Sequence, residues 1–299
     1  MITSCSPGWI KFCEYNFPDL LPNLSSCKSP QQMFGAIAKT WYAKKKGIDP
    51  KDIFVVSIMP CTAKKFETKR ENQNASGYPD VDVALTTREF SRMVKRAGIN
   101  FVNLPDGEFD LPLGASTGAA VIFGATGGVM EAALRTVYEL VTGRELPFAD
   151  LHVAPIVGLD QIKEGAIKIE NPLPEYSFLD GVEVKVAVTS GLAGAKKLLQ
   201  QIADGTSPYH FIEVMGCPGG CITGGGMPRT NDLAATREKR MKAIYTEDEG
   251  KTLRKSHENP AIIDFYNEWG KPGCHKSHEY LHTHYVPRGE YNELTDERF

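Results

Sequence analysis

Short apolar runs alternate with amphipathic stretches along this 299-residue chain. Residues 53–60, IFVVSIMP, are almost wholly apolar and rich in β-branched side chains, which predicts a strand covered on both faces. Further strands are predicted at 81–87, 184–191 and 210–217, where apolar residues stand between turn residues. The spacing of these runs leaves room for helices between them.

Helical patterns follow several of these strands. Residues 88–98 and 192–205 each end at a glycine, the residue that commonly follows the last helical turn. A Gly-rich turn leads into a long helix within residues 123–141. Pro7 predicts another helix start, because proline is favoured at the first helical position. The order strand, helix, strand predicts an α/β fold with parallel pairing.

Composition and charge exclude some classes of function. The net charge of −3 and the sequence pI of about 6.2 give no reason to expect a nucleic-acid partner. No apolar run reaches the length of a membrane span, so no membrane partner is expected. The first residues, MITSCSPGWIK, lack the charged and apolar regions of a signal peptide, and we expect a cytoplasmic protein.

Seven cysteines are dispersed along the chain, which argues against a disulfide framework in a reducing compartment. Two of them, Cys217 and Cys221, lie in the stretch MGCPGGCITGGGMP, where a turn of helix would bring both thiols to one side. The glycines around them let the backbone approach a bulky group and donate N–H groups to it. This combination suits a soft metal cluster. Zinc is the competing interpretation, although structural zinc sites usually bring such cysteines in two pairs.

Cys61 ends the first predicted strand, and Cys217 ends the last one. Ligands bind at the C-terminal ends of parallel strands, so the two cysteines are predicted to face one cleft. Lys64 and Lys65 follow Cys61, and their ammonium groups would stabilise a thiolate nucleophile. The same arrangement suits a metal ligand beside a lysine that binds an anion, and both interpretations stay open.

Cys5 lies just before the helix predicted from Pro7, in the stretch TSCSPGW. The positive end of a helix dipole lowers the pKa of a nearby thiol. Cys5 is therefore a candidate proton donor or metal ligand.

These cysteine-bearing stretches together resemble one family. TSCSPGW (3–9), MPCTAKKFE (59–67) and EVMGCPGGCITGGGMP (213–228) are similar, in the same order, to the signatures of the catalytic domain of the [FeFe]-hydrogenases. Residues 24–35 and 122–135 also look like stretches of that family. The resemblance covers nearly the whole chain.

The resemblance implies a fold of two lobes, each a small, mostly parallel sheet flanked by helices, with a cluster in the cleft between them. The chain, 1–299, would be a single catalytic domain, with lobes at roughly 1–140 and 141–285 and a polar, frayed tail at 286–299. The implied cofactor is the H-cluster, a [4Fe-4S] cubane joined through one cysteine to a diiron unit that carries CO, cyanide and a bridging dithiolate amine.

The implied reaction is the reversible reduction of protons to H2. An external ferredoxin-like carrier would supply the electrons, and maturation proteins would supply the diiron unit. Two rival functions are a non-catalytic iron–sulfur relative, acting in cluster assembly or as a scaffold, and a hydrogen sensor with slow turnover.

The resemblance also implies roles for individual residues. Cys61, Cys217 and Cys221 match cubane ligands, with Cys221 at the bridge to the diiron unit. Lys64 matches a lysine that donates to a cyanide, and Glu67 would orient this lysine. The other matches are Met59 and Met215 packed against the diiron unit, Ser29, Pro30, Gln31 and Phe123 lining its pocket, and Ser25 in the proton path.

The chain departs from the family pattern at its first motif. The pattern has two adjacent cysteines, a proton relay followed by a cubane ligand, whereas this chain has Cys5 and Ser6. Either Cys5 is the relay and Ser6 replaces the thiolate, or Cys5 is the ligand and a water or Ser6 takes the relay. Serine oxygen is a harder and more basic donor, so a serine-ligated cubane should be weaker and of lower potential.

A second departure concerns the segment before the first motif, which begins at residue 3. We expect the strands and carboxylates that precede this motif in the family to be missing, and the first lobe to pair with another chain in a homo- or hetero-oligomer. The histidines at 275, 278, 282 and 284 have a spacing that permits a metal pair. Surface or capping histidines are the favoured interpretation, since no other type of ligand accompanies them.

Overall fold

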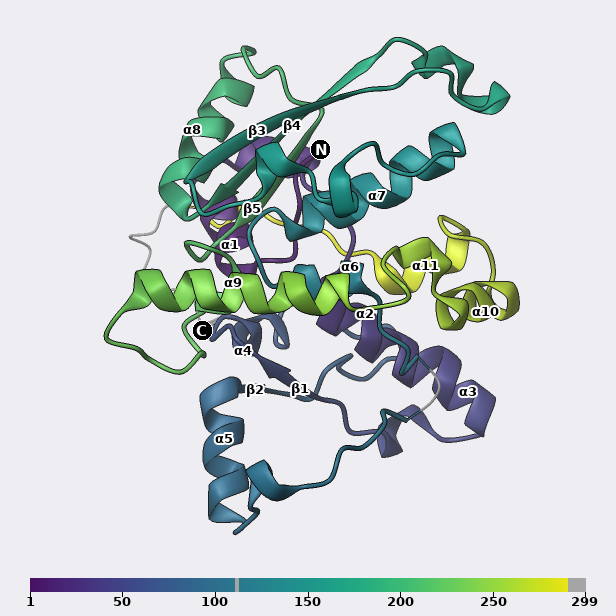
Figure 1. Cartoon of the computed structure of the whole chain (residues 1–299). Coiled ribbons are helices and arrows are strands. Elements are labelled where there is room, and N and C mark those ends of the chain that lie inside the picture. The colour runs from purple at the N-terminus through teal and green to yellow at the C-terminus, as the bar shows by residue number, and fades with distance from the viewer. Residues whose placement is uncertain (111–112, 290–299) are drawn as a thin grey trace.

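The structure is a computed structural model that describes residues 1–110 and 113–289. Within these residues the fold is mixed α/β with two small sheets (Figure 1). In the first sheet, β1 (Val56–Met59) pairs in parallel with β2 (Val83–Thr86). In the second sheet, β4 (Glu183–Ser190) lies between an antiparallel neighbour, β3 (Ile162–Lys168), and a parallel neighbour, β5 (Phe211–Met215). The four predicted strands are confirmed as β1, β2, β4 and β5.

Helices account for much of the remaining chain. They are α1 (Pro7–Asn16), α2 (Pro30–Ile37), α3 (Ala43–Lys46), α4 (Lys64–Glu67), α5 (Thr87–Arg96), α6 (Gly118–Ile122), α7 (Gly128–Thr142), α8 (Leu192–Ala203), α9 (Leu233–Glu249), α10 (Pro260–Trp269) and α11 (His275–Leu281). A π-helical turn (Ala38–Tyr42) joins α2 to α3, and short 3₁₀ segments lie at Pro18–Asn23, Pro50–Asp52, Phe101–Asn103, Ala149–Leu151, Ala154–Ile156, Pro174–Leu179, Cys221–Thr223 and Ser256–Glu258. The predicted helices are confirmed as α1, α5, α7 and α8. Within the described ranges, no helix combines the length and the hydropathy that crossing a membrane requires.

Local sequence explains where several helices begin. Pro7 stands in the first turn of α1. Thr86 and Glu89 form a capping box at the start of α5, in which each side chain binds the backbone N–H of the other residue. The Asp232 carboxylate accepts the Ala235 N–H at the start of α9. These side chains satisfy N–H groups that a first helical turn leaves without partners.

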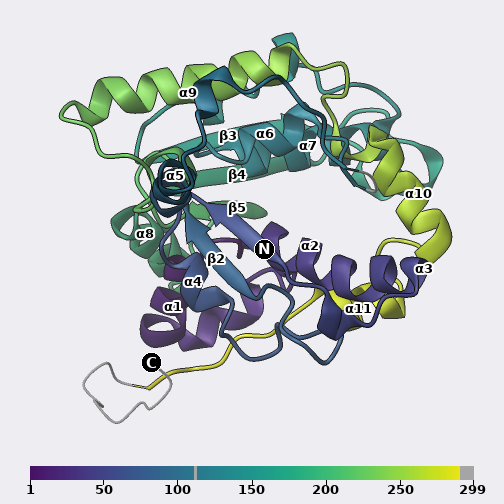
Figure 2. The same ribbon diagram turned by 90° about the horizontal axis from the view of Figure 1, so that it is seen from below.

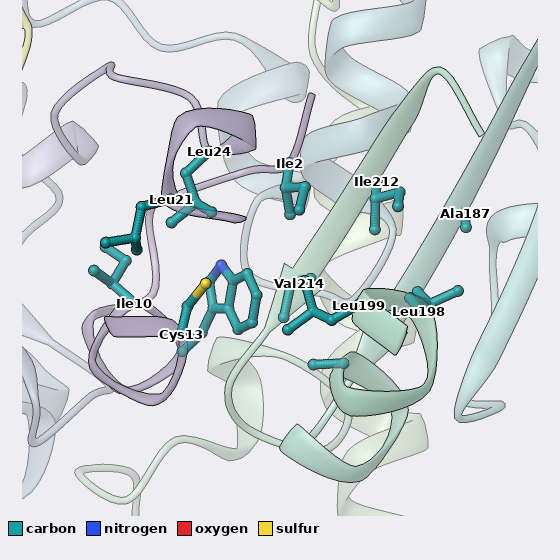
Figure 3. Close-up of a cluster of buried hydrophobic side chains, with 12 residues drawn as sticks. Ile2, Ile10, Cys13, Leu21, Leu24, Ala187, Leu198, Leu199, Ile212 and Val214 are labelled. Atoms are coloured by element: carbon teal, nitrogen blue, oxygen red, sulfur yellow. The ribbon is translucent and has the colours of Figure 1, made fainter. Parts of the chain in front are cut away.

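Different helices cover the two faces of the second sheet (Figure 1). Val186 and Val188 of β4 pack with Met130 and its neighbours on α7. Ala187 points to the opposite face, because side chains alternate along a strand, and it packs with α8 and with residues 2–24. Figure 3 shows this second cluster, where side chains of α1 and α8 meet those of β5. The N-terminal segment is therefore part of the core around the second sheet.

The C-terminal helices pack against the first half of the chain. In two views at right angles, α10 and α11 lie beside α2 and α3 (Figure 1, Figure 2). The rings of Trp41 and Phe265 meet edge-on there, with centroids 5.3 Å apart. α9 lies along α6.

The prediction that residues 53–60 form a strand covered on both faces is wrong. β1 has only four residues, and Phe54, Val56 and Ile58 have exposed fractions of 69%, 48% and 46%. Val55, which points the other way, is buried. An apolar run makes a strand suitable for burial on both faces. Whether both faces are buried depends on which other elements pack against the strand.

The prediction of a frayed tail from residue 286 is also wrong for its first residues. Arg288 Nε lies 2.5 Å from the buried carboxylate of Glu14, and the Val286 N–H donates to the same carboxylate. A buried carboxylate is unfavourable without such partners. These bonds to Glu14 therefore hold the chain in place as far as residue 288. Residues 290–299 of the predicted tail lie outside the described residues.

Candidate metal-cluster site

The first six residues run alongside β5, from Ile212 to the residue that follows the strand. The Thr3 N–H donates to the Ile212 carbonyl at 2.9 Å, as if the N-terminal segment extended the sheet. This pairing carries Cys5 and Ser6 to the loop that follows β5. The Ser6 hydroxyl accepts a hydrogen bond from the Gly216 N–H at 3.1 Å. The first motif thus touches the third.

The end of β1 is held against the Gly-rich loop that follows Cys221. The Gly226 N–H donates to the Pro60 carbonyl at 2.8 Å, and a side-chain carbon at Gly224 would lie 2.3 Å from that same oxygen. We expected these glycines to approach a bulky group, but Gly224 and Gly226 instead approach another backbone segment. Because these glycines have no side chain, the motif that contains Cys61 can lie beside the motif that contains Cys217 and Cys221.

The chain between Cys217 and Cys221 forms a tight turn instead of the helical turn considered above. Gly219 and Gly220 have φ values of +88° and +93°, which L side chains rarely adopt. A side-chain carbon at Gly220 would lie 2.6 Å from the backbone nitrogen of Thr126, whose N–H donates to the Gly219 carbonyl. The turn therefore also fixes the loop that leads into α7.

A buried polar network lies behind the second motif. Lys64 Nζ lies 2.9 and 3.0 Å from the two carboxylate oxygens of Glu67 and donates to the Cys5 carbonyl at 2.8 Å. Glu67 also accepts bonds from the Ser29 hydroxyl at 2.7 Å and from the Gln31 amide at 2.6 Å. The Lys64 side chain is 9% exposed and that of Glu67 is 4% exposed. The expected contact between Glu67 and Lys64 is therefore present.

The thiols of the three motifs gather around Cys221. Burial, together with the nearby thiols of Cys5, Cys61 and Cys217, raises the pKa of Cys221 to about 12, although the Lys64 ammonium lowers it. Burial likewise raises the pKa of Cys5 to about 11, against the same ammonium. The two strand ends thus face one site, as predicted. In the metal-free protein Cys5 and Cys221 are protonated at neutral pH.

The Cys217 thiol receives one of the amide hydrogen bonds expected from the glycine loop. Burial and then Cys61 raise the pKa of Cys217, whereas the Gly225 N–H bonded to its sulfur lowers it. No three metal-binding side chains at these described motifs lie within 4.8 Å of one another. A tetrahedral zinc ion would hold its sulfurs about 4 Å apart. The donor spacing therefore fits a larger, polynuclear group better than zinc.

The predicted lining residues occupy different environments. Met215 is buried at the end of β5, and Met59 is half-buried at the end of β1. Phe123 is half-buried and follows α6 directly. Pro30 is exposed in the first turn of α2, next to the buried Ser29. Met59 and Met215 each stand two residues before a motif cysteine, Cys61 and Cys217.

Ser25 is not joined directly to Cys5. Its hydroxyl accepts the Cys27 N–H at 3.3 Å, and its carbonyl accepts the Tyr285 hydroxyl at 2.8 Å. Among the described residues, no hydrogen bond connects the Ser25 and Cys5 side chains. A proton path between them needs an intervening group.

Two residues that hold the site were not predicted. The Ser57 hydroxyl donates to the Gln31 amide oxygen at 2.8 Å, which fixes the amide orientation. The fully buried Glu213 accepts the Gly127 N–H at 2.6 Å and the Met130 N–H at 2.7 Å, and so binds β5 to the start of α7. Burial raises the pKa of Glu213 to about 7, although both N–H bonds lower it. Its signal in the sequence is a lone carboxylate inside the apolar run of β5.

The histidine stretches form polar networks. Glu139, His257 and Glu258 could together ligate a cation, but Lys255 Nζ lies 2.7 Å from Glu139 and 2.8 Å from Glu258. An ammonium group therefore already neutralises these carboxylates. His282, near the C-terminus, bonds a serine hydroxyl at 2.8 Å.

The fold and the site define an α/β protein with a buried site of several thiols. Residues 1–225 match the sequence family described as the iron only hydrogenase large subunit, C-terminal domain, and the chain belongs to this family. Residues 234–288, from α9 to the C-terminal segment, match the iron hydrogenase small subunit.

Two hydrogenases of similar sequence are longer than this chain. The chain is 50% identical over 289 residues to the NADP-reducing hydrogenase subunit HndD of Solidesulfovibrio fructosivorans, covering 96% of this chain and 47% of that protein. It is 44% identical to Iron hydrogenase 1 of Clostridium pasteurianum, covering 95% and 48%. The chain thus spans about half the length of these curated relatives.

One solved structure similar to this chain is the [FeFe]-hydrogenase HydA1 from Chlamydomonas reinhardtii. The TM-score is 0.83 at 46% identity, covering 97% of this chain and 76% of that chain. A cytosolic Fe-S cluster assembly factor of Xenopus tropicalis is more distant, with 28% identity over 95% of this chain and 58% of the factor.

Proposed function

We propose that this chain catalyses the reversible reduction of protons to H2 at an H-cluster. The observation that carries the proposal is the gathering of the thiols of three motifs around Cys221, beside the buried ammonium of Lys64. Membership of the iron-only hydrogenase family supports it. So does the identity of 44–50% to hydrogenases, against 28% to a cluster assembly factor.

Cys61, Cys217 and Cys221 would hold the cubane. Soft thiol donors spaced too widely for one ion, with an amide N–H bonded to one sulfur, fit an iron–sulfur cluster. Cys221 would take the bridge to the diiron unit, as the resemblance implies, and Cys5, Lys64, Cys61 and Cys217 all act on its thiol. When bound, the H-cluster supplies the electron and hydrogen chemistry, and the protein supplies the surroundings.

Lys64 would bind an anionic ligand of the diiron unit. An ammonium group in a buried site makes strong, charge-assisted hydrogen bonds. Glu67 holds this ammonium in place, and Ser29 and Gln31 hold Glu67 in turn. The remaining pocket wall would come from Pro30, Met59, Phe123 and Met215.

Cys5 would carry protons to the site. Because burial raises its pKa to about 11, the thiol keeps its proton at neutral pH until a more basic group takes it. Ser25 would lie further along the path, with a water between the two side chains.

We place the site in a cleft between two lobes, roughly 1–140 built around β1–β2 and 141–285 built around β3–β5. An external ferredoxin-like carrier would deliver electrons. Maturation proteins would insert the diiron unit, since a similar structure, HydA(deltaEFG), is described as revealing stepwise H-cluster assembly. The seven free thiols suit the reducing cytoplasm.

The test is H2 evolution by the reconstituted chain. The purified protein is loaded anaerobically with iron and sulfide, then with a synthetic diiron complex, and assayed with a reduced low-potential dye. Cys221→Ala is treated in parallel, and Cys13→Ala is the matched control, because Cys13 lies outside the three motifs and is buried in the hydrophobic cluster of α1, α8 and β5.

We expect H2 from the parent and from Cys13→Ala, and none from Cys221→Ala. A cubane spectrum without H2 would overturn the proposal in favour of a non-catalytic iron–sulfur protein. Equal H2 from parent and Cys221→Ala would show that the activity does not arise at this site.

A further inference from the structure

The Ser6 hydroxyl faces away from the helix that it precedes. Ser6 is the N-cap residue of α1, where a serine side chain commonly accepts an N–H of the first turn. Here the side chain makes no capping bond, and its oxygen accepts the Gly216 N–H at 3.1 Å. The hydroxyl therefore points to the cysteine-bearing loop instead of to its own helix.

Gly216 lets this hydroxyl approach the backbone next to Cys217. A side-chain carbon at residue 216 would lie 2.7 Å from Ser6 Oγ, so a larger residue there would push the hydroxyl out of its present position. The next residue is Cys217. Among the described residues, the Gly216 N–H is the only hydrogen-bond partner recorded for the Ser6 hydroxyl. Its proton and one lone pair are therefore unused.

Cys5 lies beside Lys64. Lys64, which donates to the Cys5 carbonyl at 2.8 Å, is also the main cation beside the Cys5 thiol. Ser6, the next residue, instead accepts the Gly216 N–H, next to Cys217. The two adjacent residues are therefore held by different parts of the site, Cys5 by Lys64 of the second motif and Ser6 by the loop that carries Cys217.

We infer that Ser6 Oγ is the fourth protein ligand of the cubane, with the Cys61, Cys217 and Cys221 sulfurs as the other three, and that Cys5 is not a ligand. This inference rests on the proposed function, which places a [4Fe-4S] cubane here, and such a cluster takes four protein ligands. Cys5 remains free to carry protons beside Lys64.

The bond requires no redox partner. An iron–oxygen bond forms, the Ser6 O–H bond breaks, its proton goes to solvent, and no oxidation state changes. The Gly216 N–H keeps donating to the oxygen and stabilises the alkoxide. An oxygen donor is harder than sulfur, so this cubane has a lower reduction potential and one more labile iron than a cubane with four thiolates.

The test uses the full chain reconstituted anaerobically with iron and sulfide alone. Ser6→Cys, Ser6→Ala and Cys5→Ser are compared with the parent, and Ser4→Cys controls for an added thiol close by. The readouts are iron per chain, the electron paramagnetic resonance spectrum of the reduced cluster, and its midpoint potential. Circular dichroism shows whether each variant folds.

We expect Ser6→Cys to raise the midpoint potential and to slow iron loss to a chelator. Ser6→Ala should lose one iron of four on mild oxidation and then show the signal of a three-iron cluster. Cys5→Ser and Ser4→Cys should leave the cluster spectrum as in the parent.

Two results would overturn the inference while the cluster site stands. In the first, Cys5→Ser shifts the spectrum and potential while both Ser6 variants match the parent. In the second, neither position matters, and the fourth ligand is a water. A parent chain that binds no four-iron cluster, or one that survives Cys61→Ala unchanged, would instead overturn the proposed function itself.

Discussion

Glu67 is the residue on which most polar contacts of the site converge. Its carboxylate binds the Lys64 ammonium, the Ser29 hydroxyl and the Gln31 amide, with 4% of the side chain exposed. Lys65, next along α4, pairs with Glu89 on the surface, where 45% of the lysine side chain is exposed. Removing the partner of Lys64 should therefore destabilise the protein more than removing the partner of Lys65, although the two lysines are adjacent on one helix.

At this scale we predict the effect of removing each partner's charge. Glu67→Gln should lower the free energy of unfolding of the metal-free protein by about 3 kcal/mol, because it leaves the Lys64 ammonium buried and unpaired. Lys65→Gln should change it little, since water already screens that pair. Urea titrations of both variants and the parent measure the difference. A Glu67→Gln protein as stable as the parent would mean that Lys64 is hydrated or neutral there.

At the scale of elements, two helix glycines offer a matched pair. Gly35 of α2 packs closely against the backbone at Asp80. A methyl group at Gly35 would lie 2.1 Å from the Asp80 carbonyl oxygen. Around Gly8 of α1 there is open space. We predict that Gly8→Ala raises the free energy of unfolding by about 0.5–1 kcal/mol, because alanine favours a helix. Gly35→Ala should lower it by about 2 kcal/mol through overpacking. Denaturant titration that gave both substitutions the same sign would contradict the packing of α2.

The link between α7 and α9 should respond to pH. His152 lies 3.0 Å from Glu131 of α7 and 3.2 Å from Glu249 of α9. The hydrogen bond to Glu131 raises the pKa of His152 above 6.5, while burial and the Arg135 charge oppose it. A raised pKa means that the stabilisation is complete below the unfolded value of 6.5 and is lost as pH rises through the folded value.

We therefore predict that the free energy of unfolding of the parent decreases between roughly pH 6 and pH 8. His152→Gln should flatten this part of the profile and should be less stable than the parent chiefly at low pH. Urea titrations at several pH values measure both. An identical slope in parent and variant would assign the dependence to another group.

At the scale of the whole molecule, the first sheet leaves an apolar face uncovered. Phe54, Val56 and Ile58 lie on one side of β1, beside an apolar groove that Phe34 and Trp41 line. Exposed apolar surface of this kind is typical of an interaction site or a cause of self-association.

We predict that the protein self-associates as its concentration rises. The double substitution Val56→Lys, Ile58→Lys should reduce the association without lowering the melting temperature, because both side chains are already exposed. Phe178→Lys, at an exposed aromatic position on the other sheet's side of the chain, should leave association unchanged. Sedimentation velocity distinguishes these outcomes. Equal association in all three proteins would exclude the β1 face as its cause.

The sequence by itself determined β1, β2, β4 and β5, the helices α1, α5, α7 and α8, the motif cysteines and the family. These features depend on local periodicity, on turn residues and on side-chain chemistry, all of which a short stretch of chain contains. The convergence of Cys61 and Cys217 was also predictable, because both follow parallel strands whose carboxyl ends carry the ligand sites.

Only the tertiary structure decided which surfaces and groups meet. The apolar run of β1 did not reveal that one face is uncovered, and the glycines after Cys221 did not reveal that Pro60 is their close neighbour. The direction of the Ser6 hydroxyl depends on Gly216, some 210 residues away along the chain. Such contacts depend on long-range packing, and local periodicity carries no information about the partner that a side chain finds.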